Sequence, residues 1–451
     1  MSLLGIRMRL RVYSILASVS VLTAGGVALA QRDPRASVIK LAQNMSGGTP
    51  TANVTDVGTK AIRDQDFIDR IGVNTHIPYT DGGYADIDKV LEALRYLGVG
   101  NLRDAVPDPS LPGGGGSHYG AFASAGFKFD FVVASNLPLT KTLSLLDDFA
   151  RIHPRAITSV EGPNEVNNWP VTYNGQKGPD AAVAYQNDLY KGVKASPLLD
   201  EVSVYNLTSW PELFGLSDVY NAHIYPPKGE QPGVHVKNVV DQADRLEPKR
   251  AAAITEVGYY TLPGKGTWGG VDEPTQAKLS LNLILDAVYT GVAKVYLYQL
   301  LDAYPDPASS EMEKHFGLFD IGYRPKPAAT AIRNLIQTVS AKGREGSAGG
   351  AGLPKLTVSS GELDVKHLLV EGDGGLATLI LWDERPIWDS EKNVPLPVTP
   401  VTVTVDSEAD LPAIEIFDPA AGAEPVQTLD KGRSVTVPLQ GSPKLIRFRA
   451  R

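Results

Sequence analysis

The sequence predicts an α/β fold: a (β/α)8 TIM barrel followed by a C-terminal all-β sandwich domain. Between Phe67 and about residue 335, short apolar strands alternate with amphipathic helical patterns. A glycine- and alanine-rich stretch, residues 341–354, then has the composition of a linker. Beyond it the hydrophobic period changes to two, as in a sandwich. A chain of 451 residues with 43% apolar content is long enough for two such domains.

Residues 1–30 have the pattern of a secretory signal peptide. A basic start with Arg7, Arg9 and Arg11 precedes an apolar run from Ile15 to Ala28, and Ala28-Leu29-Ala30 is a small-x-small cleavage signal. An uncleaved membrane anchor is the alternative, but the apolar run is short for a membrane span. We therefore expect an exported protein, periplasmic or extracellular, with no membrane contact after cleavage.

Eight strands and the helices between them make up the predicted barrel, residues 31–340. The strands are expected at Ile71–His76, Val99–Arg103, Phe127–Ala134, Ile157–Val160, Val202–Leu207, Val219–Ile224, Ala252–Glu256 and Lys294–Leu300. Helical spacing is found at Ile87–Leu97, Thr140–Phe149, Ala182–Lys194, Val236–Leu246 and Thr275–Tyr289. This alternation fits a barrel of about 250 residues. A doubly wound sheet is the alternative, but no glycine-rich phosphate loop follows the first strand.

The two ends of the chain are expected to belong together in the second domain. Residues 355–451 contain short alternating segments, among them Val401–Val405 and Ile414–Ile416, which predict the sandwich. The polar residues 31–60 precede the first barrel strand, and Val38–Leu41 could add a strand to the C-terminal domain.

Composition excludes several kinds of chemistry. The formal net charge is −8 and becomes more negative once the three signal-peptide arginines are lost, which disfavours nucleic acid and anionic membranes as partners. The chain has no cysteine, so disulfides, thiolate metal sites and cysteine nucleophiles are excluded. Its seven histidines are scattered without H-x-H or H-E-x-x-H spacing, and no G-x-S-x-G motif occurs. We expect neither a metal nor a cofactor.

Two glutamates end apolar strands and are the strongest candidates for chemistry. Glu165 closes the stretch ITSVEGPNE, in which Pro163 should stop regular strand pairing, and Glu256 ends the strand AAAITE. A parallel barrel brings the carboxyl ends of its strands together at one face. Cleavage of a glycosidic bond needs one carboxylic acid that protonates the leaving oxygen and a second, ionised carboxylate. The two glutamates therefore predict a glycosidase.

Four short motifs carry a resemblance to a known group of enzymes. They are Asn164-Glu165 after the fourth strand, H-x-Y at His223 and Tyr225 after the sixth, Thr255-Glu256 on the seventh, and GLFD…KPA at Gly317–Ala328. In this order and spacing they resemble the retaining glycoside hydrolases of clan A, in particular family 39 or a family 5 relative. The resemblance covers residues 67–335 and implies a TIM barrel and a double-displacement mechanism.

The resemblance also implies roles for individual residues. Glu165 would be the acid/base, and Glu256 would be the nucleophile. Asn164 would hydrogen-bond the sugar 2-hydroxyl.

Three neighbours of the nucleophile are implied in the same way. Arg103, which ends the second strand, would keep Glu256 charged, because a nearby cation favours the ionised form. Tyr225 would hydrogen-bond Glu256, and His223 would line the same wall.

The sequence departs from this group at two places. Such enzymes usually place a tryptophan on the eighth strand under the sugar, where this chain reads VYLYQLLD, so Tyr298, Gln299 or Asp302 could take that place. EGPNE also carries an additional acidic residue, Glu161, which could pair with a cation or could itself be the acid.

Other polar and aromatic residues near the strand ends have two interpretations each. His76 could be a core histidine or a sugar contact. Trp169, Tyr173 and Trp268, on the loops after strands four and seven, could stack on sugars or pack their own loops. His118 and Tyr119, which follow a run of four glycines, are expected on a mobile surface, with substrate contact as the alternative.

Taken together, these observations predict a retaining glycoside hydrolase that acts on an oligo- or polysaccharide. A transglycosylase with the same residues is the first alternative. A non-catalytic exported polysaccharide-binding protein is the second, and a purely structural periplasmic protein is the third. In the C-terminal domain only Trp382 and Trp388 are large candidates for sugar binding, and we expect that domain to support the barrel instead. The sugar and its linkage are not predicted.

Overall fold

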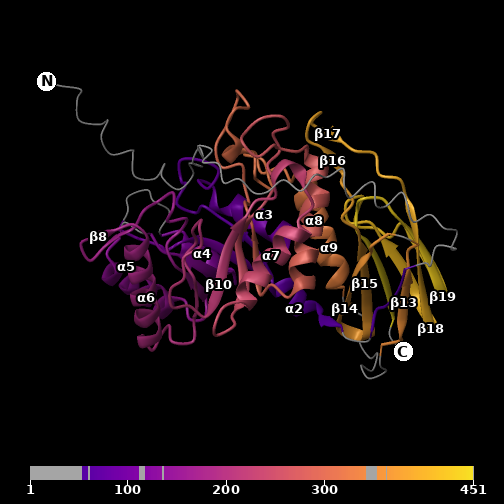
Figure 1. Cartoon of the computed structure of the whole chain (residues 1–451), viewed down its shortest axis with the longest axis horizontal. Coiled ribbons are helices and arrows are strands. Elements are labelled where there is room, and N and C mark those ends of the chain that lie inside the picture. The colour runs from indigo at the N-terminus through magenta and orange to yellow at the C-terminus, as the bar shows by residue number, and fades with distance from the viewer. Residues whose placement is uncertain are drawn as a thin grey trace, which may run out of the picture.

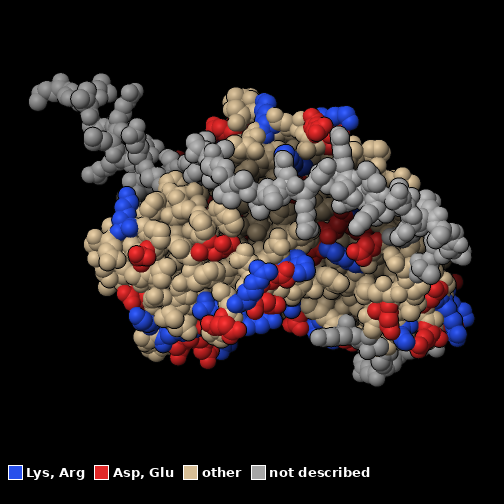
Figure 2. Space-filling view, in the orientation of Figure 1, with Lys and Arg blue, Asp and Glu red and all other residues tan. Residues whose placement is uncertain are grey.

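The computed structural model describes residues 53–58, 61–110, 117–134, 137–341, 353–361 and 363–449. The predicted signal peptide, the possible strand Val38–Leu41 and most of the predicted linker lie outside these residues. Among them, no helix is both long and apolar enough to cross a membrane. Figure 2 shows acidic and basic side chains intermingled with broad uncharged areas on the face in view.

Eight parallel strands close into a barrel, which confirms the predicted (β/α)8 fold. In barrel order they run β10-β11-β12-β3-β4-β5-β6-β9, so each strand lies beside its neighbour in sequence. Their bounds are β3 (Ile71–Asn74), β4 (Asn101–Ala105), β5 (Lys128–Val132), β6 (Ile157–Glu161), β9 (Ser203–Tyr205), β10 (Val219–Ile224), β11 (Ala251–Val257) and β12 (Lys294–Leu297). Because all eight are parallel, their carboxyl ends meet at one face of the barrel.

Helices cover the outside of the barrel (Figure 1). They are α2 (Asp64–Asp69), α3 (Ile87–Leu97), α4 (Tyr119–Ser124), α5 (Leu139–Ile152), α6 (Pro179–Ala195), α7 (Gly233–Asp244), α8 (Glu273–Thr290) and α9 (Pro327–Val339). Helix α3 begins where Asp86 accepts a hydrogen bond from the Lys89 N–H at 3.2 Å, and it ends at Gly98, whose φ is 83°. This side-chain N-cap and left-handed C-cap satisfy backbone groups at the two ends of the helix and so define where it begins and ends.

One connection of the barrel carries no helix. Residues 206–218, all within the described part of the chain, join β9 to β10 as an irregular segment. The segment is short and contains Pro211 and Gly215, which both oppose helix formation. The flank of the barrel between α6 and α7 is therefore covered by a loop, including the exposed Trp210.

The C-terminal strands form a second sheet whose order is β1-β13-β18-β20-β15-β14-β2, with β19 paired to β18. Their bounds are β1 (Val54–Asp56), β2 (Ile62–Arg63), β13 (Leu356–Ser359), β14 (Lys366–Glu371), β15 (Leu376–Trp382), β18 (Val401–Phe417), β19 (Gln427–Leu439) and β20 (Lys444–Arg449). The two segments predicted at Val401–Val405 and Ile414–Ile416 are parts of one long strand, β18. Its register shifts between Asp406 and Leu411, so it pairs with β13 before the shift and β20 after it.

Residues that precede the barrel supply β1 and β2, the strands at the two ends of this order. β1 pairs antiparallel with β13, and β2 pairs parallel with β14. The added strand is thus Val54–Asp56 within the range 31–60. Short hairpins and turns complete the described structure: β7 (Thr172–Tyr173), β8 (Gln176–Lys177), β16 (Trp388–Asp389), β17 (Val394–Pro395), η1 (Pro227–Gly229), η2 (Met312–Lys314) and η3 (Asp373–Gly375).

The second domain packs on α8 and α9 (Figure 1) through a buried polar contact inside an apolar interface. The fully buried Trp382 on β15 donates its indole N–H to Oδ1 of Asp286 on α8 at 3.0 Å. Lys366 on β14 donates to the same oxygen at 2.8 Å. Trp388 is also buried, against Tyr259 and Val271. Neither tryptophan presents a face to solvent, so both serve packing.

Replacing Trp382 with alanine should destabilise the protein without altering the barrel mouth. Deleting a buried aromatic side chain costs about 3–5 kcal/mol, and here it also removes a partner of Asp286. We expect a lower thermal unfolding midpoint by calorimetry, with Trp382→Phe intermediate because it keeps most of the ring and loses only the N–H. An unchanged midpoint for Trp382→Ala would contradict this account of the interface.

Candidate active site

A buried arginine lies at the centre of the carboxyl-terminal face of the barrel. Arg103, on β4, is 4% exposed and donates through all five of its N–H groups. Nε and Nη2 bind the two oxygens of Glu161 at 2.6 and 2.9 Å, and Nη1 binds Oε1 of Glu256 at 2.6 Å. The remaining hydrogen bonds go to Oδ1 of Asn74 at 2.9 Å and Oδ1 of Asn164 at 2.8 Å. One guanidinium thus orients side chains from three strands and one loop.

Glu161, the additional acidic residue of EGPNE, is the bidentate partner of Arg103 and is fully buried. Burial alone would raise the pKa of Glu161, but Arg103 and His223 outweigh it and lower the pKa to about 2. An ionised carboxylate held in this way accepts hydrogen bonds and has no proton to give. The structure therefore favours the pairing interpretation over the acid interpretation for Glu161.

Glu256 projects from β11 with both oxygens engaged. Oε1 accepts from Arg103, and Oε2 accepts from the hydroxyl of Tyr225 at 2.7 Å. The side chain is 12% exposed, so it reaches the surface of the cavity. His223 on β10 lies close by, with Nδ1 3.6 Å from Oε2 of Glu256. A carboxylate fixed by two donors but still accessible is suited to attack a bound substrate.

Glu165 sits on the loop after β6 in a strained backbone conformation. Its φ is 41°, in the left-handed region that glutamate rarely adopts. The loop is held to the β9–β10 connection, because the Glu165 N–H donates to Oγ1 of Thr208 at 2.9 Å and the Val166 N–H donates to the Thr208 carbonyl at 3.0 Å. Strain of this kind costs about 1–3 kcal/mol and is concentrated at functional sites.

Gly162 allows the same loop to approach the β9–β10 connection closely. A Cβ at this position would lie 2.8 Å from the backbone N of Leu207 and would clash with the Gln186 side chain. Any other residue would therefore push the loop outward and move Glu165 with it.

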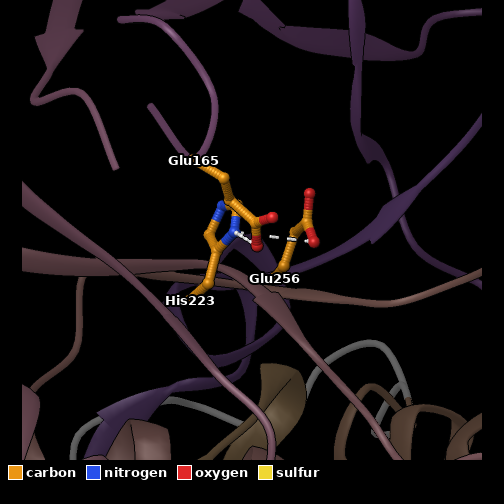
Figure 3. A group of neighbouring side chains, drawn as sticks. All are labelled: Glu165, His223 and Glu256. Carbon is orange, nitrogen blue, oxygen red and sulfur yellow. Dashed lines mark hydrogen bonds and ion pairs between the residues drawn. The ribbon is translucent and has the colours of Figure 1, made fainter. Parts of the chain in front are cut away.

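His223 connects the two glutamates (Figure 3). Its Nδ1 lies 3.0 Å from Oε1 of Glu165, and Asn168 donates to the other oxygen of Glu165 at 3.0 Å. Burial alone would lower the pKa of His223, but Glu256, Glu161 and Glu165 raise it to about 9. Burial would raise the pKa of Glu165, but hydrogen bonds from His223 and Asn168 lower it. At neutral pH His223 is therefore protonated and Glu165 is ionised.

Glu165, His223 and Glu256 each offer one ligand atom within 4.8 Å of the others, a spacing that could hold a metal ion. Two cations already face these carboxylates. Arg103 donates to Glu256, and a protonated His223 has no lone pair for a metal. A metal would have to displace the proton of His223 and tolerate the guanidinium, so the arrangement is better suited to acid/base chemistry.

Three aromatic side chains pack around Tyr225. Its ring centroid is 5.0 Å from Trp268, 6.1 Å from Tyr298 and 5.5 Å from Phe316. Trp268 is half-buried and packs against Tyr225. Burial raises the pKa of Tyr225 far above its ordinary value, which keeps the hydroxyl protonated as a donor to Glu256.

His76 lies beside this aromatic cluster, next to the end of the eighth strand, where the resemblance would place a tryptophan. His76 stacks on Tyr79 at 4.7 Å and meets the edge of Tyr298 at 5.7 Å. Burial and the charge of Arg103 lower the pKa of His76 to about 3, so its imidazole is neutral. Gln299 directs its amide to the Glu313 carbonyl at 3.1 Å. Tyr298, Gln299 and His76 therefore occupy the part of the site where the eighth strand ends.

Several residues predicted near the site have other functions. Asp302 pairs with Lys326 at 2.7 Å and accepts from the Gly317 N–H, so it holds the loop after β12. Tyr173 bonds Asp188 and packs against Tyr185, so it packs its own loop. Tyr119 is fully buried, and its hydroxyl donates to Asp104 at 2.8 Å. Its expected mobile surface position is therefore wrong, because the aromatic ring completes the core under α4.

Asp104 and Trp169 lie beside residues of the site. Asp104 does not pair with Arg103. It instead accepts from the Thr75 hydroxyl and the Ile77 N–H, on the outer side of β4. Trp169 is half-buried, and its N–H donates to the Glu165 carbonyl at 2.9 Å. This contact fixes the Trp169 backbone at the site.

Glu313, which the sequence did not single out, is a fourth carboxyl group at the site, beside Glu161, Glu165 and Glu256. It lies in η2 after the eighth strand, and Oε2 accepts from the Tyr298 hydroxyl at 3.4 Å. Burial together with the charges of Glu256 and Glu165 raises the pKa of Glu313 to about 7. No strand ends at Glu313 and no motif includes it, so only the folded chain reveals its position.

Comparisons by sequence find no relative. No protein-family model matches the chain, and no curated protein matches it either. Comparison by structure is different. A family 39 glycoside hydrolase from the gut symbiont Bacteroides cellulosilyticus WH2 matches with a TM-score of 0.58 at 15% identity, over 87% of this chain and 83% of that one.

Two other solved structures are similar over most of the chain. A glucosidase from Croceicoccus marinus has a TM-score of 0.56 at 12% identity, covering 88% of this chain and 99% of its own. The family 39 enzyme from Xanthomonas axonopodis pv. citri has a TM-score of 0.52 at 14% identity, covering 87% and 96%. The predicted resemblance to family 39 therefore holds at the level of the fold, a barrel with an appended β domain.

The ion pair of Arg103 and Glu161 gives a prediction with a definite pH dependence. The Glu161→Gln variant should lose about 3–5 kcal/mol of stability at pH 7, because it leaves part of a buried guanidinium unpaired. The folded pKa of about 2 lies below the ordinary value of 4.5, so the stabilisation is complete above about pH 4.5 and is lost as pH falls towards 2.

Thermal unfolding midpoints measured at pH 7 and pH 3 check this. The gap between wild type and Glu161→Gln should be wide at pH 7 and narrower at pH 3. A gap that is constant across this range would show that the Glu161 charge contributes nothing to folding.

Proposed function

We propose that this protein is a retaining glycoside hydrolase that cleaves an O-glycosidic bond of an oligo- or polysaccharide with Glu165 and Glu256. The observation that carries the proposal is their spacing. One carboxylate oxygen of each lies within 4.8 Å of the other, at the mouth of the barrel. Retaining glycosidases place their two carboxyl groups about 5–5.5 Å apart, whereas inverting ones leave about 6.5–9.5 Å for a water molecule.

In the first step Glu256 attacks the anomeric carbon. The bond from that carbon to the glycosidic oxygen breaks, and the oxygen takes a proton from Glu165. The product is a glycosyl ester of Glu256 and a free leaving group. Glu165 must carry the proton at this moment, and Nδ1 of His223 is 3.0 Å away to supply it. His223 thus acts as a proton store for the acid/base.

In the second step a water molecule attacks the anomeric carbon of the ester. Glu165, now ionised, takes a proton from the water, and Glu256 departs as a carboxylate. The charge of Glu256 changes as the ester forms and breaks, and Arg103 and Tyr225 remain in hydrogen-bond contact with it. Two displacements at the same carbon leave the sugar with its original anomeric configuration.

Residues around the pair would hold the sugar. Asn164 accepts from Arg103 through Oδ1, so its amide N–H groups are the ones that would meet the sugar 2-hydroxyl. The neutral His76, Gln299 and the carboxyl group of Glu313 would bond other hydroxyls of the sugar. Trp169 and Trp268, which are half-buried on the loops after β6 and β11, are the proposed stacking surfaces.

Retention can be tested on the first product formed. Proton NMR of a β-glycoside digestion should show the β-anomer appearing before mutarotation produces the α-anomer. The physical reason is that both displacements invert the same carbon. Early appearance of the α-anomer would rule out the double displacement, and the absence of any cleavage across a broad glycan panel would favour a binding protein.

The two glutamates can be distinguished by azide rescue. Glu165→Ala should lower turnover of unactivated glycosides about 10²–10⁴-fold, the usual contribution of a general acid. On glycosides with good leaving groups azide should restore turnover and give a β-glycosyl azide, because the small anion needs no general base. The matched variant Glu256→Ala should give the α-azide. The reverse outcome would exchange the two roles.

A further inference from the structure

A polar cleft extends from the catalytic pair along the flank of the barrel where no helix covers it. Its volume is about 470 Å³, within the usual range of about 300–1,000 Å³ for small-molecule sites. Four segments line it: the loop after β6, the β9–β10 connection, strand β10, and helix α7 with Arg245 directly after it. The cleft exists because residues 206–218 join β9 to β10 without a helix between α6 and α7.

The cleft lies on one side of the catalytic pair only. Glu165 and His223 line it, whereas Glu256 and Tyr225 are absent from its lining among the residues that the structure describes. The acid/base faces the glycosidic oxygen, and the nucleophile faces the sugar that becomes bound to the enzyme. A space that adjoins Glu165 and excludes Glu256 is therefore on the leaving-group side of the scissile bond.

The chemistry of the lining suits an uncharged sugar chain. Trp210 is 66% exposed, an unusual state for an indole, and it offers a flat face to the apolar side of a pyranose. Amide side chains of Asn167, Asn168 and Asn238 also line the cleft and can both donate and accept hydrogen bonds. Three carboxylates line the cleft, Glu165, Glu212 and Asp241, against the cations Arg245 and His223, and this small negative excess disfavours anionic chains.

Hydrogen bonds tie Trp210 to the acid/base. Asn168 donates to Glu165 at 3.0 Å, Asn167 donates to Asn168 at 2.8 Å, and the backbone N–H of Trp210 donates to Oδ1 of Asn167 at 3.0 Å. Thr208, two residues before Trp210, accepts from the Glu165 N–H. The backbone of Trp210, from which the indole projects, is therefore held in position relative to the carboxyl group of Glu165.

We propose that this cleft binds the leaving-group end of an uncharged β-linked glycan, with Trp210 stacking on a sugar ring beyond the scissile bond. The proposal rests on the proposed hydrolase function and adds a substrate class to it. A site of this size beyond the leaving oxygen favours chains that continue past the cleaved bond over glycosides of small alcohols.

Two kinds of substrate distinguish a loss of binding in the cleft from a loss of catalysis by Glu165 and Glu256. Wild type, Trp210→Ala and Phe214→Ala would be assayed on β-linked gluco-, xylo- and manno-hexaoses and on the matching 4-nitrophenyl β-glycosides. Phe214 is the matched control, since it is an aromatic residue of the same connection, 43% exposed and outside the cleft lining. Trp210→Ala should lower kcat/KM on the hexaoses about tenfold or more, the usual loss on truncating a central aromatic contact. Its kcat/KM on nitrophenyl glycosides should stay unchanged.

An equal loss on both substrate types would overturn the proposal, because Trp210 would then act on the catalytic pair or on folding. Unchanged kinetics on the hexaoses would overturn it as well. Phe214→Ala should match wild type throughout.

A binding measurement decides the proposal even if no panel member is hydrolysed, which would count against the hydrolase function alone. Glu256→Gln would be run through native gels that contain laminarin, barley β-glucan, xylan or glucomannan. Retardation by at least one glycan that disappears in Glu256→Gln/Trp210→Ala supports the cleft. Retardation that persists in the double variant, or none with any of the four, overturns it.

Discussion

The site depends on one buried guanidinium and the five hydrogen bonds that it donates. Placing Arg103 inside the barrel carries a large desolvation cost, which is offset only because Glu161 binds it in bidentate fashion and Glu256 takes a further N–H. The same contacts fix Asn164 and, through Glu161, the face of the barrel that His223 occupies. The hydrogen bonds that stabilise the buried Arg103 are therefore the same ones that hold Glu256 and Asn164 in position at the mouth of the barrel.

The two candidate catalytic groups are held in different ways. Glu256 is at the end of β11 and is locked by Arg103 and Tyr225, so its position follows from the barrel itself. Glu165 lies beyond the last residue of β6 in a left-handed conformation, on a loop held by the contacts with Thr208 and by the hydrogen bond from Arg103 to Asn164. In the proposed mechanism this difference suits a fixed nucleophile, Glu256, and an acid/base, Glu165, that exchanges protons with two different oxygens and with His223.

Much of the fold and the centre of the site could be predicted from local signals. Each barrel strand is an apolar run, and residues such as Arg103, Glu165 and Glu256 stand where those runs end, so barrel closure brings them together. The failures have a common cause. Glu313 and Trp210 lie on irregular segments whose path depends on tertiary contacts, and nothing in their neighbours shows where they point. Tyr119 follows a glycine run that suggested solvent, whereas the core beneath α4 required an aromatic ring.

Two outer strands of the C-terminal sheet come from the opposite end of the chain, since β1 pairs with β13 and β2 pairs with β14. The first described residues to leave the ribosome thus pair with strands that are made only after the whole barrel. Residues 353–449 alone would present two bare edges, open to pairing with other chains. The second domain therefore needs β1 and β2 from the start of the chain to complete its sheet. The completed sheet in turn holds the segments before and after the barrel next to each other.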